Sequence, residues 1–216
     1  MFLKGSYTAL ITPFKNGEVD FDGLIKLINY QLANNIDGIL VLGTTGETPT
    51  LTQDEQIEII KVSKKTINGK VPLMVGTGAY STYKTIENTR IAKELGADIA
   101  LIVTPYYNKP TDEGLYRHFL EISSNVDIPI VVYNIQSRTG KNIDTPTLKR
   151  IAQLKNIIGV KEASGNINQM MDVIQSIVYS KPDFSVMCGD DALTLPLLSV
   201  GGLGVISVVS NIIPQR

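Results

Sequence analysis

The chain has 216 residues, 43% hydrophobic and 19% charged, a composition typical of globular proteins and a length that suits one large domain or two small ones. The formal net charge of −1 gives no indication of a nucleic acid or an anionic membrane surface as partner, and the one cysteine, Cys188, excludes an intramolecular disulfide and a cysteine-rich metal site. No apolar stretch reaches the ~18 residues of a membrane span, and the N-terminus lacks the form of a signal peptide, so we expect a cytoplasmic protein.

Short apolar strands alternate with amphipathic helices along the whole chain. Thr52 and Glu55 are spaced as the capping box of the second helix, and Gly96 is placed to end the third. The expected strands are 6–14, 38–43, 72–78, 99–108, 129–134, 157–165, 184–191 and 204–210, and the expected helices are 20–35, 52–67, 83–96, 112–125, 145–154, 168–178 and 192–201.

Eight strands separated by helices predict parallel pairing, and their continuous apolar runs predict burial of both faces. A doubly wound open sheet and a (β/α)8 barrel both fit this rhythm. The open sheet usually has a glycine-rich phosphate turn after its first strand, whereas here that strand runs into "TPFKNGEVD". We therefore predict an α/β protein with the (β/α)8 TIM-barrel fold.

Polar groups collect where the predicted strands end, which is where barrel enzymes place their chemistry. The most informative is Lys161, which follows the apolar run "IIGV", because burial of an ammonium lowers its pKa and makes a nucleophile toward carbonyls. The strand ends also carry Thr44, Thr45, Glu47, Thr104, Tyr106, Tyr107, Tyr133, Asn134, Arg138, Glu162, Asp190 and Asp191, which could converge on one cavity.

Each of these residues also has a structural interpretation. Taken alone, Lys161 is more often a surface side chain whose amine reaches water, Tyr133 a packing residue and Arg138 a solvated charge. We interpret Asp190 and Asp191 as caps of the seventh helix in preference to a metal site, His118 as a surface residue and Cys188 as core. The catalytic interpretation depends on the polar residues meeting at one end of the barrel.

At these residues the sequence resembles the dihydrodipicolinate synthase / N-acetylneuraminate lyase family. The similarity runs in order along nearly the whole chain, so residues 1–216 are expected to form one barrel domain. The matching stretches are "GTTGE", "VTPYYNKP", "GLYRHF", "VVYN", "SRTG", "IIGVKEASGN", "GDDA" and "GVISV".

The resemblance implies a lyase that condenses pyruvate with aspartate-4-semialdehyde on the route to diaminopimelate and lysine, with no metal or organic cofactor. Lys161 would form a Schiff base with pyruvate. Thr44 and Tyr133 would relay protons together with Tyr107, which a neighbouring subunit of a homodimer or homotetramer would contribute.

The resemblance also implies the residues that bind the substrates. Thr45 and nearby backbone amides would hold the pyruvate carboxylate, Arg138 would hold a carboxylate of the second substrate, and Ile206 would lie beside the site through its carbonyl. Sialic acid and keto-deoxy sugar lyases of the family share the lysine and tyrosine, and the "SRTG" arginine favours the short acidic substrate.

The family's barrel is normally followed by further helices, whereas this chain ends at Arg216, so we expect a barrel truncated after strand eight. Val205 or Ile206, whichever faces outward, would then lose cover, and we expect lowered stability or association. A non-catalytic remnant, or an accessory subunit of a complete homologue, is the alternative to an active enzyme.

Overall fold

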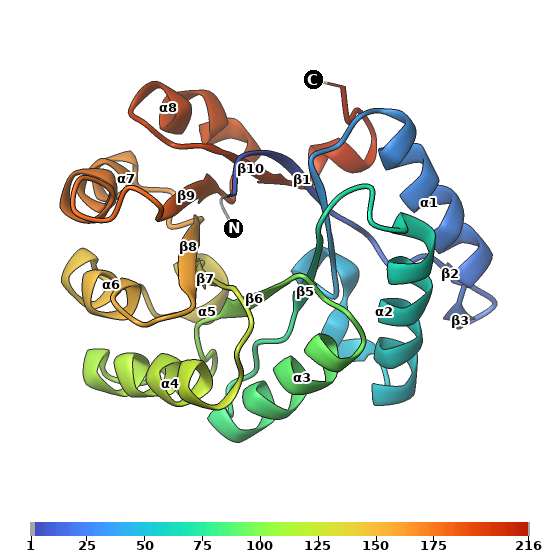
Figure 1. Ribbon diagram of the computed structural model, residues 1–216, viewed down its shortest axis with the longest axis horizontal. Helices are drawn as coiled ribbons and strands as arrows, with labels where there is room; N and C mark the ends of the chain where they lie inside the picture. Colours follow the sequence, from blue (N-terminus) through green and yellow to red (C-terminus); the bar gives the residue numbers. More distant parts are fainter. Residues whose placement is uncertain (1–2, 216) are drawn as a thin grey trace.

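The computed structural model describes residues 3–215, and within them eight parallel strands close into a barrel surrounded by helices (Figure 1). The (β/α)8 prediction is therefore confirmed. In order around the barrel the strands are β1 (Gly5–Ala9), β10 (Gly204–Ser207), β9 (Ser185–Cys188), β8 (Ile157–Glu162), β7 (Ile130–Asn134), β6 (Ile99–Val103), β5 (Leu73–Gly76) and β4 (Gly38–Val41).

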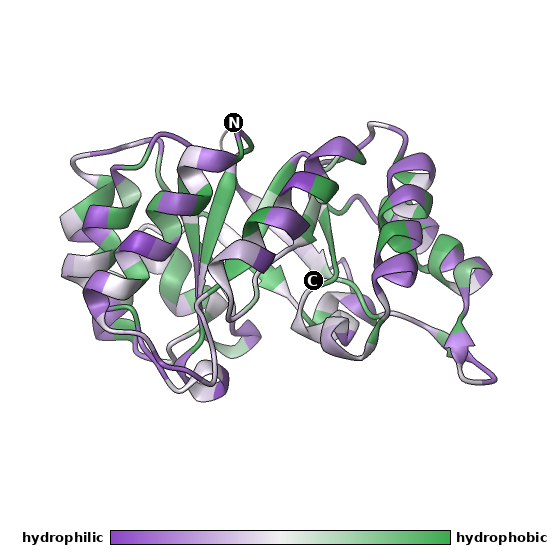
Figure 2. Ribbon diagram, turned by 90° about the horizontal axis from the view of Figure 1, so that it is seen from below, coloured by the Kyte–Doolittle hydropathy of each residue, from purple (hydrophilic) through white to green (hydrophobic). Residues whose placement is uncertain are grey.

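The outer layer consists of helices whose apolar faces pack on the strands, and Figure 2 shows hydrophobic strands inside and hydrophilic helix faces outside. The α-helices are α1 (Phe21–Ala33), α2 (Gln53–Ile67), α3 (Thr82–Glu94), α4 (Asp112–Asn125), α5 (Gln136–Thr139), α6 (Thr145–Ala152), α7 (Ile167–Val173) and α8 (Thr194–Ser199). Shorter helical turns are η1 (Thr44–Gly46), η2 (Thr48–Thr50), η3 (Ile174–Val178, a π-helix that continues α7), η4 (Asp191–Leu193) and η5 (Val209–Asn211). None of the described helices is long and apolar enough to cross a membrane.

The predicted start of α2 and the predicted end of α3 are confirmed by the hydrogen bonds and backbone angles at these positions. The Thr52 hydroxyl accepts a hydrogen bond from the Glu55 N–H, and the Glu55 carboxylate accepts one from the Thr52 N–H at 2.7 Å, which completes the capping box of α2. Gly96 follows the end of α3 with a φ of 90°, a conformation that favours glycine.

A small hairpin between β1 and α1 was not predicted. It pairs β2 (Phe14–Lys15) with β3 (Glu18–Val19), and the turn is Asn16-Gly17, both with positive φ. An Asn-Gly pair is the preferred two-residue hairpin turn, so the signal was in the sequence, but each strand is too short to show an alternating pattern.

The prediction that His118 is a surface residue is wrong. On α4 the buried side chains are Leu115, His118, Phe119 and Ile122, a spacing that puts the histidine on the face toward the barrel. Its Nδ1 lies 2.9 Å from the Thr82 hydroxyl of α3, and burial lowers the pKa of His118 to about 4. Cys188 is fully buried in the core, as expected.

The segment after β10 is attached to α1 by polar contacts. Gln31 accepts a hydrogen bond from the Thr8 hydroxyl at 2.6 Å and donates one to the Ser210 carbonyl at 2.9 Å. Asn211 donates to the Ala9 carbonyl at 2.8 Å. These contacts hold η5 against the strand-one side of the barrel, near the C-terminal label in Figure 1.

Of the two residues named for loss of cover, Ile206 is fully buried inside the barrel, whereas Val205 is partly buried against the helix-side core. Exposed apolar side chains instead gather on α8 and in residues 208–213. They are Leu195, Leu198, Val208, Val209, Ile212 and Ile213. The expected effect on stability and association stays a prediction.

Candidate active site

The site lies at the carboxyl ends of the strands and is centred on β7 and β8. These neighbouring strands are in a register that pairs Tyr133 with Lys161 and Asn134 with Glu162. Side chains alternate between the two faces of a strand, so one pair faces into the barrel and the other faces the helices. Tyr133 belongs to the inner cluster, with the Lys161 ammonium 4.3 Å from the centre of its ring.

Lys161 is a buried amine without a counter-ion. Its exposed fraction is 4%, and within residues 3–215 no carboxylate forms an ion pair with it. Burial lowers the pKa of Lys161 to about 8, against the opposing charge of Asp191 and with a smaller lowering contribution from Arg138. A much larger share of the molecules than for an ordinary lysine therefore carries the neutral amine at pH 7.

Gly189, at the end of β9, provides space for this lysine. A Cβ at position 189 would lie 2.7 Å from Cβ of Ala163, 3.0 Å from Cε of Lys161 and 3.1 Å from its Cγ, so the glycine makes room for both residues. In the sequence Gly189 stands out only as the first residue of the stretch "GDDA", and its role is visible only in three dimensions.

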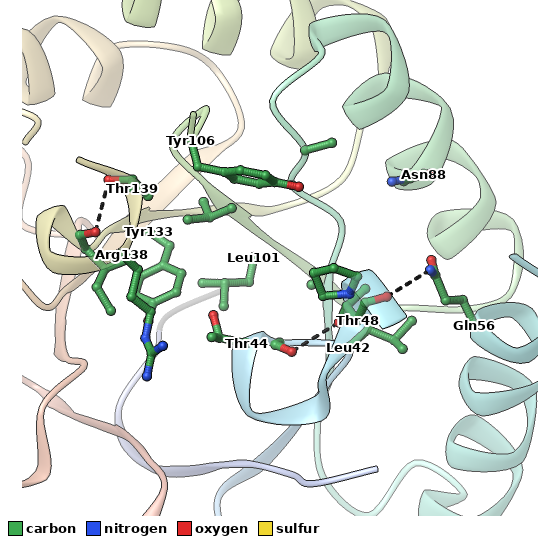
Figure 3. A pocket seen from close by; sticks show the side chains of 17 residues that line it. Leu42, Thr44, Thr48, Gln56, Asn88, Leu101, Tyr106, Tyr133, Arg138 and Thr139 are labelled. Atoms are coloured by element: carbon green, nitrogen blue, oxygen red, sulfur yellow. Dashed lines mark hydrogen bonds between the residues drawn. The ribbon is translucent and has the colours of Figure 1, made fainter. Parts of the chain in front are cut away.

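Tyr133 connects the lysine to a cavity of about 390 Å³. The cavity is lined by Thr44, Tyr133 and Arg138 and extends past Tyr106 to Thr48, Gln56 and Asn88, while Lys161 lies outside its lining (Figure 3). Burial raises the pKa of Tyr133, opposed by a hydrogen bond with Thr44 and by the charge of Arg138.

Arg138 is positioned by α5, the short helix that follows β7, and Figure 3 shows its side chain extending beside the Tyr133 ring. Thr44 is the first residue of η1, which turns directly after β4. The stretch "GTTGE" is thus a tight turn whose first two residues, Gly43 and Thr44, line the cavity.

Not all predicted site residues meet here. Thr45 is half-buried beside Thr44 but does not line the cavity, and Ile206 is fully buried in the inner cluster that contains Tyr133. Tyr107 is 90% exposed with a φ of 69° and does not contribute to the cavity of its own chain.

The strand-end polar residues do not all converge on one cavity, which corrects the prediction. Asn134 and Glu162 are fully buried on the helix side of β7 and β8. Each directly follows an inward-facing residue, Tyr133 or Lys161, and successive side chains of a strand point to opposite faces. Thr104 is also fully buried, and its hydroxyl has no hydrogen-bond partner among the described residues.

The prediction that Asp190 and Asp191 both cap the seventh helix is correct only for Asp190, which caps the turn η4 that leads into α8. Asp190 accepts a hydrogen bond from the Ala192 N–H at the start of η4. Asp191 accepts from the N–H groups of Val208 and Val209 and so caps the turn after β10 instead of the seventh helix. No cluster of potential metal ligands occurs within residues 3–215.

Residues 2–216 match the family model described as the dihydrodipicolinate synthetase family. The chain belongs to this family. It is 59% identical to the 4-hydroxy-tetrahydrodipicolinate synthase of Protochlamydia amoebophila (strain UWE25) over 99% of this chain and 72% of the relative, and 50% identical to that of Hydrogenobaculum sp. (strain Y04AAS1) over 99% and 73%. These relatives confirm the prediction of a lyase.

Solved structures give the same assignment. The dihydrodipicolinate synthase of Thermotoga maritima is 46% identical with a TM-score of 0.98 over 100% of this chain and 73% of that chain. A monomeric dihydrodipicolinate synthase variant is 47% identical with a TM-score of 0.97 over 98% and 71%.

The amine of Lys161 should titrate near pH 8 in the folded chain. Reductive methylation with formaldehyde, followed residue by residue by mass spectrometry, should reach half of its maximal rate at Lys161 near pH 8. In urea the same residue should behave like an ordinary lysine, with a midpoint near ~10.4.

The lowered pKa also fixes the sign of a stability effect. The folded chain binds fewer protons than the unfolded chain between pH ~8 and ~10.4, so Lys161 makes the free energy of unfolding rise with pH in this window. The variant Lys161→Met should lack this contribution. A midpoint above pH 9.5 in the folded chain would contradict the buried, unpaired amine.

Proposed function

We propose that the chain is a class I aldolase that condenses pyruvate with L-aspartate-4-semialdehyde to give 4-hydroxy-tetrahydrodipicolinate, in the diaminopimelate and lysine pathway. The observation that carries the proposal is the buried, unpaired amine of Lys161 against the ring of Tyr133. The names of the relatives support the same reaction.

The proposed chemistry begins at Lys161. Its neutral amine attacks the carbonyl carbon of pyruvate, water leaves and an iminium forms. The iminium withdraws electrons from the neighbouring methyl group, which loses a proton to give an enamine. The enamine carbon then attacks the aldehyde carbon of the second substrate, and the aldehyde oxygen takes up a proton to become the 4-hydroxyl. The amino group of the same substrate next attacks the iminium carbon, which closes the six-membered ring with a C=N bond and releases Lys161 as the free amine. The water lost when the iminium formed is the by-product. Because the iminium is the electron sink, the reaction requires no metal or organic cofactor.

Proton transfer is assigned to the hydroxyls of Thr44 and Tyr133. A phenol with a pKa near ~10 is a weak base at pH 7, and burial raises the pKa of Tyr133 further. The hydroxyl therefore acts by passing a proton on while it receives another, and Thr44, which lines the same cavity, would provide the first link. We assign Tyr107 of a neighbouring subunit as the outer link.

Substrate binding is assigned to residues around the cavity mouth. Arg138 would hold a carboxylate of the semialdehyde, Thr45 with nearby backbone amides would hold the pyruvate carboxylate, and Ile206 would contribute its carbonyl beside the site. Two acidic substrates suit a site with an ammonium and a guanidinium in a chain of net charge −1. A homodimer or homotetramer and a cytoplasmic location stay predictions.

Pyruvate followed by borohydride should add one reduced pyruvyl group, and peptide mapping should place it on Lys161. Lys161→Arg keeps the positive charge but should remain unlabelled. Labelling of another lysine in the wild type, or equal labelling of the variant, would exclude Lys161 as the Schiff-base residue. Activity of the purified 216-residue chain separates an enzyme from a non-catalytic remnant.

Arg138→Ala should impair use of the semialdehyde and leave pyruvate trapping nearly unchanged. A charge-assisted bidentate bond of roughly 1.5–3 kcal/mol corresponds to about one to two orders of magnitude in kcat/KM for the second substrate. Arg138→Lys keeps the positive charge but cannot form the bidentate bond, so its kcat/KM for the second substrate should lie between those of the wild type and Arg138→Ala. If the wild type cleaves sialic acid and ignores the semialdehyde, the sugar-lyase alternative is correct.

Mixed oligomers test the assignment of Tyr107. Tyr107→Phe should lose about 10²–10⁴-fold in activity because a proton-transfer group is missing, and Lys161→Arg should be nearly inactive because the nucleophilic amine is missing. After the two variants are unfolded and refolded together, mixed dimers would hold one intact site of two. A 1:1 mixture should therefore regain about a quarter of the wild-type activity. No recovery in dimers of confirmed mixed composition would exclude a role for Tyr107 across the interface.

A further inference from the structure

A closed polar network lies behind the candidate active site, on the helix side of β7 and β8. Its centre is Glu162, a fully buried carboxylate that accepts hydrogen bonds from Asn134 Nδ2 at 3.1 and 3.2 Å and from the Ser164 N–H at 2.8 Å. Gln169 of α7 donates a longer bond of 3.4 Å. No cation pairs with Glu162 among residues 3–215, and burial raises its pKa.

The network continues into the loop that follows Arg138. Asn134 Nδ2 also donates to Asn142 Oδ1 at 2.9 Å, and Asn134 Oδ1 accepts from the Ile143 N–H at 3.1 Å. Gln169 accepts from Asn142 Nδ2 at 2.7 Å and donates to the Ile143 carbonyl at 3.2 Å. The end of β7, the end of β8, α7 and residues 142–143 are therefore joined by one set of hydrogen bonds, which are buried at Asn134 and Glu162 and part-buried at Asn142 and Gln169.

The members of this network are covalent neighbours of the residues that face the site. Asn134 follows Tyr133, Glu162 follows Lys161, and the Asn134–Glu162 bond spans the same pair of strands as the contact between Tyr133 and Lys161. A rotation or slip of either strand end would break a bond to a buried carboxylate, which is costly when no water can replace it. The Asn134–Glu162 pair on the helix side thus restrains the Tyr133–Lys161 pair inside the barrel.

We propose that Glu162 and Asn134 are positioning residues, which fix the Lys161 amine against Tyr133 and anchor the loop behind Arg138. This inference rests on the proposed function for its consequence in turnover, but the placement of the amine can be measured without any substrate.

The variants are chosen to separate positioning from general stabilisation. Glu162→Gln keeps the shape but puts an amide donor opposite Asn134 Nδ2 and Gln169 Nε2. The double variant Glu162→Gln/Asn134→Asp again pairs one carboxylate with one amide. The side chain at position 162 is then the donor and the one at position 134 the acceptor, the reverse of the wild type. The control is Asn156→Ala, which removes a buried amide bonded to the carbonyls of Val126 and Ile128 at the opposite end of β8.

Glu162→Gln should lower the rate of pyruvate trapping and kcat by roughly tenfold to a hundredfold, the effect of a misplacement near 1 Å, with a smaller change in KM for pyruvate. The pH midpoint of Lys161 methylation should also shift, because the amine takes a different place relative to Tyr133 and Arg138. The double variant should recover most of both effects. Asn156→Ala should lower the melting temperature while leaving kcat and the midpoint at the wild-type values.

The proposal is overturned if folded Glu162→Gln keeps the wild-type midpoint and trapping rate, or if Asn156→Ala changes them as much. The methylation measurement keeps this outcome distinct from failure of the proposed function. A wild type that forms no pyruvate adduct would refute the aldolase, whereas a midpoint shifted in Glu162→Gln and unchanged in Asn156→Ala would still support positioning.

Discussion

The rest of the site depends on the burial of one amine. Lys161 faces the interior of an apolar barrel, where an ammonium is poorly solvated, and no carboxylate within residues 3–215 forms an ion pair with it. The π-face of Tyr133 supplies a partial substitute for water, because an aromatic ring attracts a cation without taking its proton. A carboxylate in the same place would stabilise the charged form and suppress the nucleophile. The barrel therefore accepts a less stable arrangement at the position where reactivity is needed.

The two faces of β7 and β8 have different roles. The inward face carries groups that would meet substrate, and the outward face carries Asn134 and Glu162, which bond to the helix layer. Strand geometry alone produces this division, since consecutive side chains point in opposite directions. A substitution on the helix side of these strands can thus change the reaction rate at the site inside the barrel, although the substituted residue contacts no substrate.

The fold could be predicted well from sequence because the eight apolar runs and the helix signals at Thr52 and Gly96 agree with one another. Lys161, Tyr133, Thr44 and Arg138 could be predicted as neighbours because barrel strands bring their carboxyl ends together. His118 was misplaced because histidine is usually near the surface, although the stripe from Leu115 to Ile122 includes it. The outward orientation of Asn134 and Glu162 could not be predicted, because the apolar runs do not show which strand residues face the helices. The space at Gly189 depends on its distance to side chains from another strand, which only the three-dimensional structure shows.

The contact between β1 and β10 has a consequence for the order of folding. The two strands that close the barrel stand almost 200 residues apart, and Asn211 reaches back to Ala9 and Ile11. At ~5–20 residues per second, the ribosome delivers β10 roughly 10–40 s after β1. During this interval β1 has a neighbour in β4 but a free edge on its other side, where a nascent chain is open to wrong pairing. Completion of the ring, and with it the protected interior around Lys161, therefore has to wait until residues 204–207 have left the ribosome.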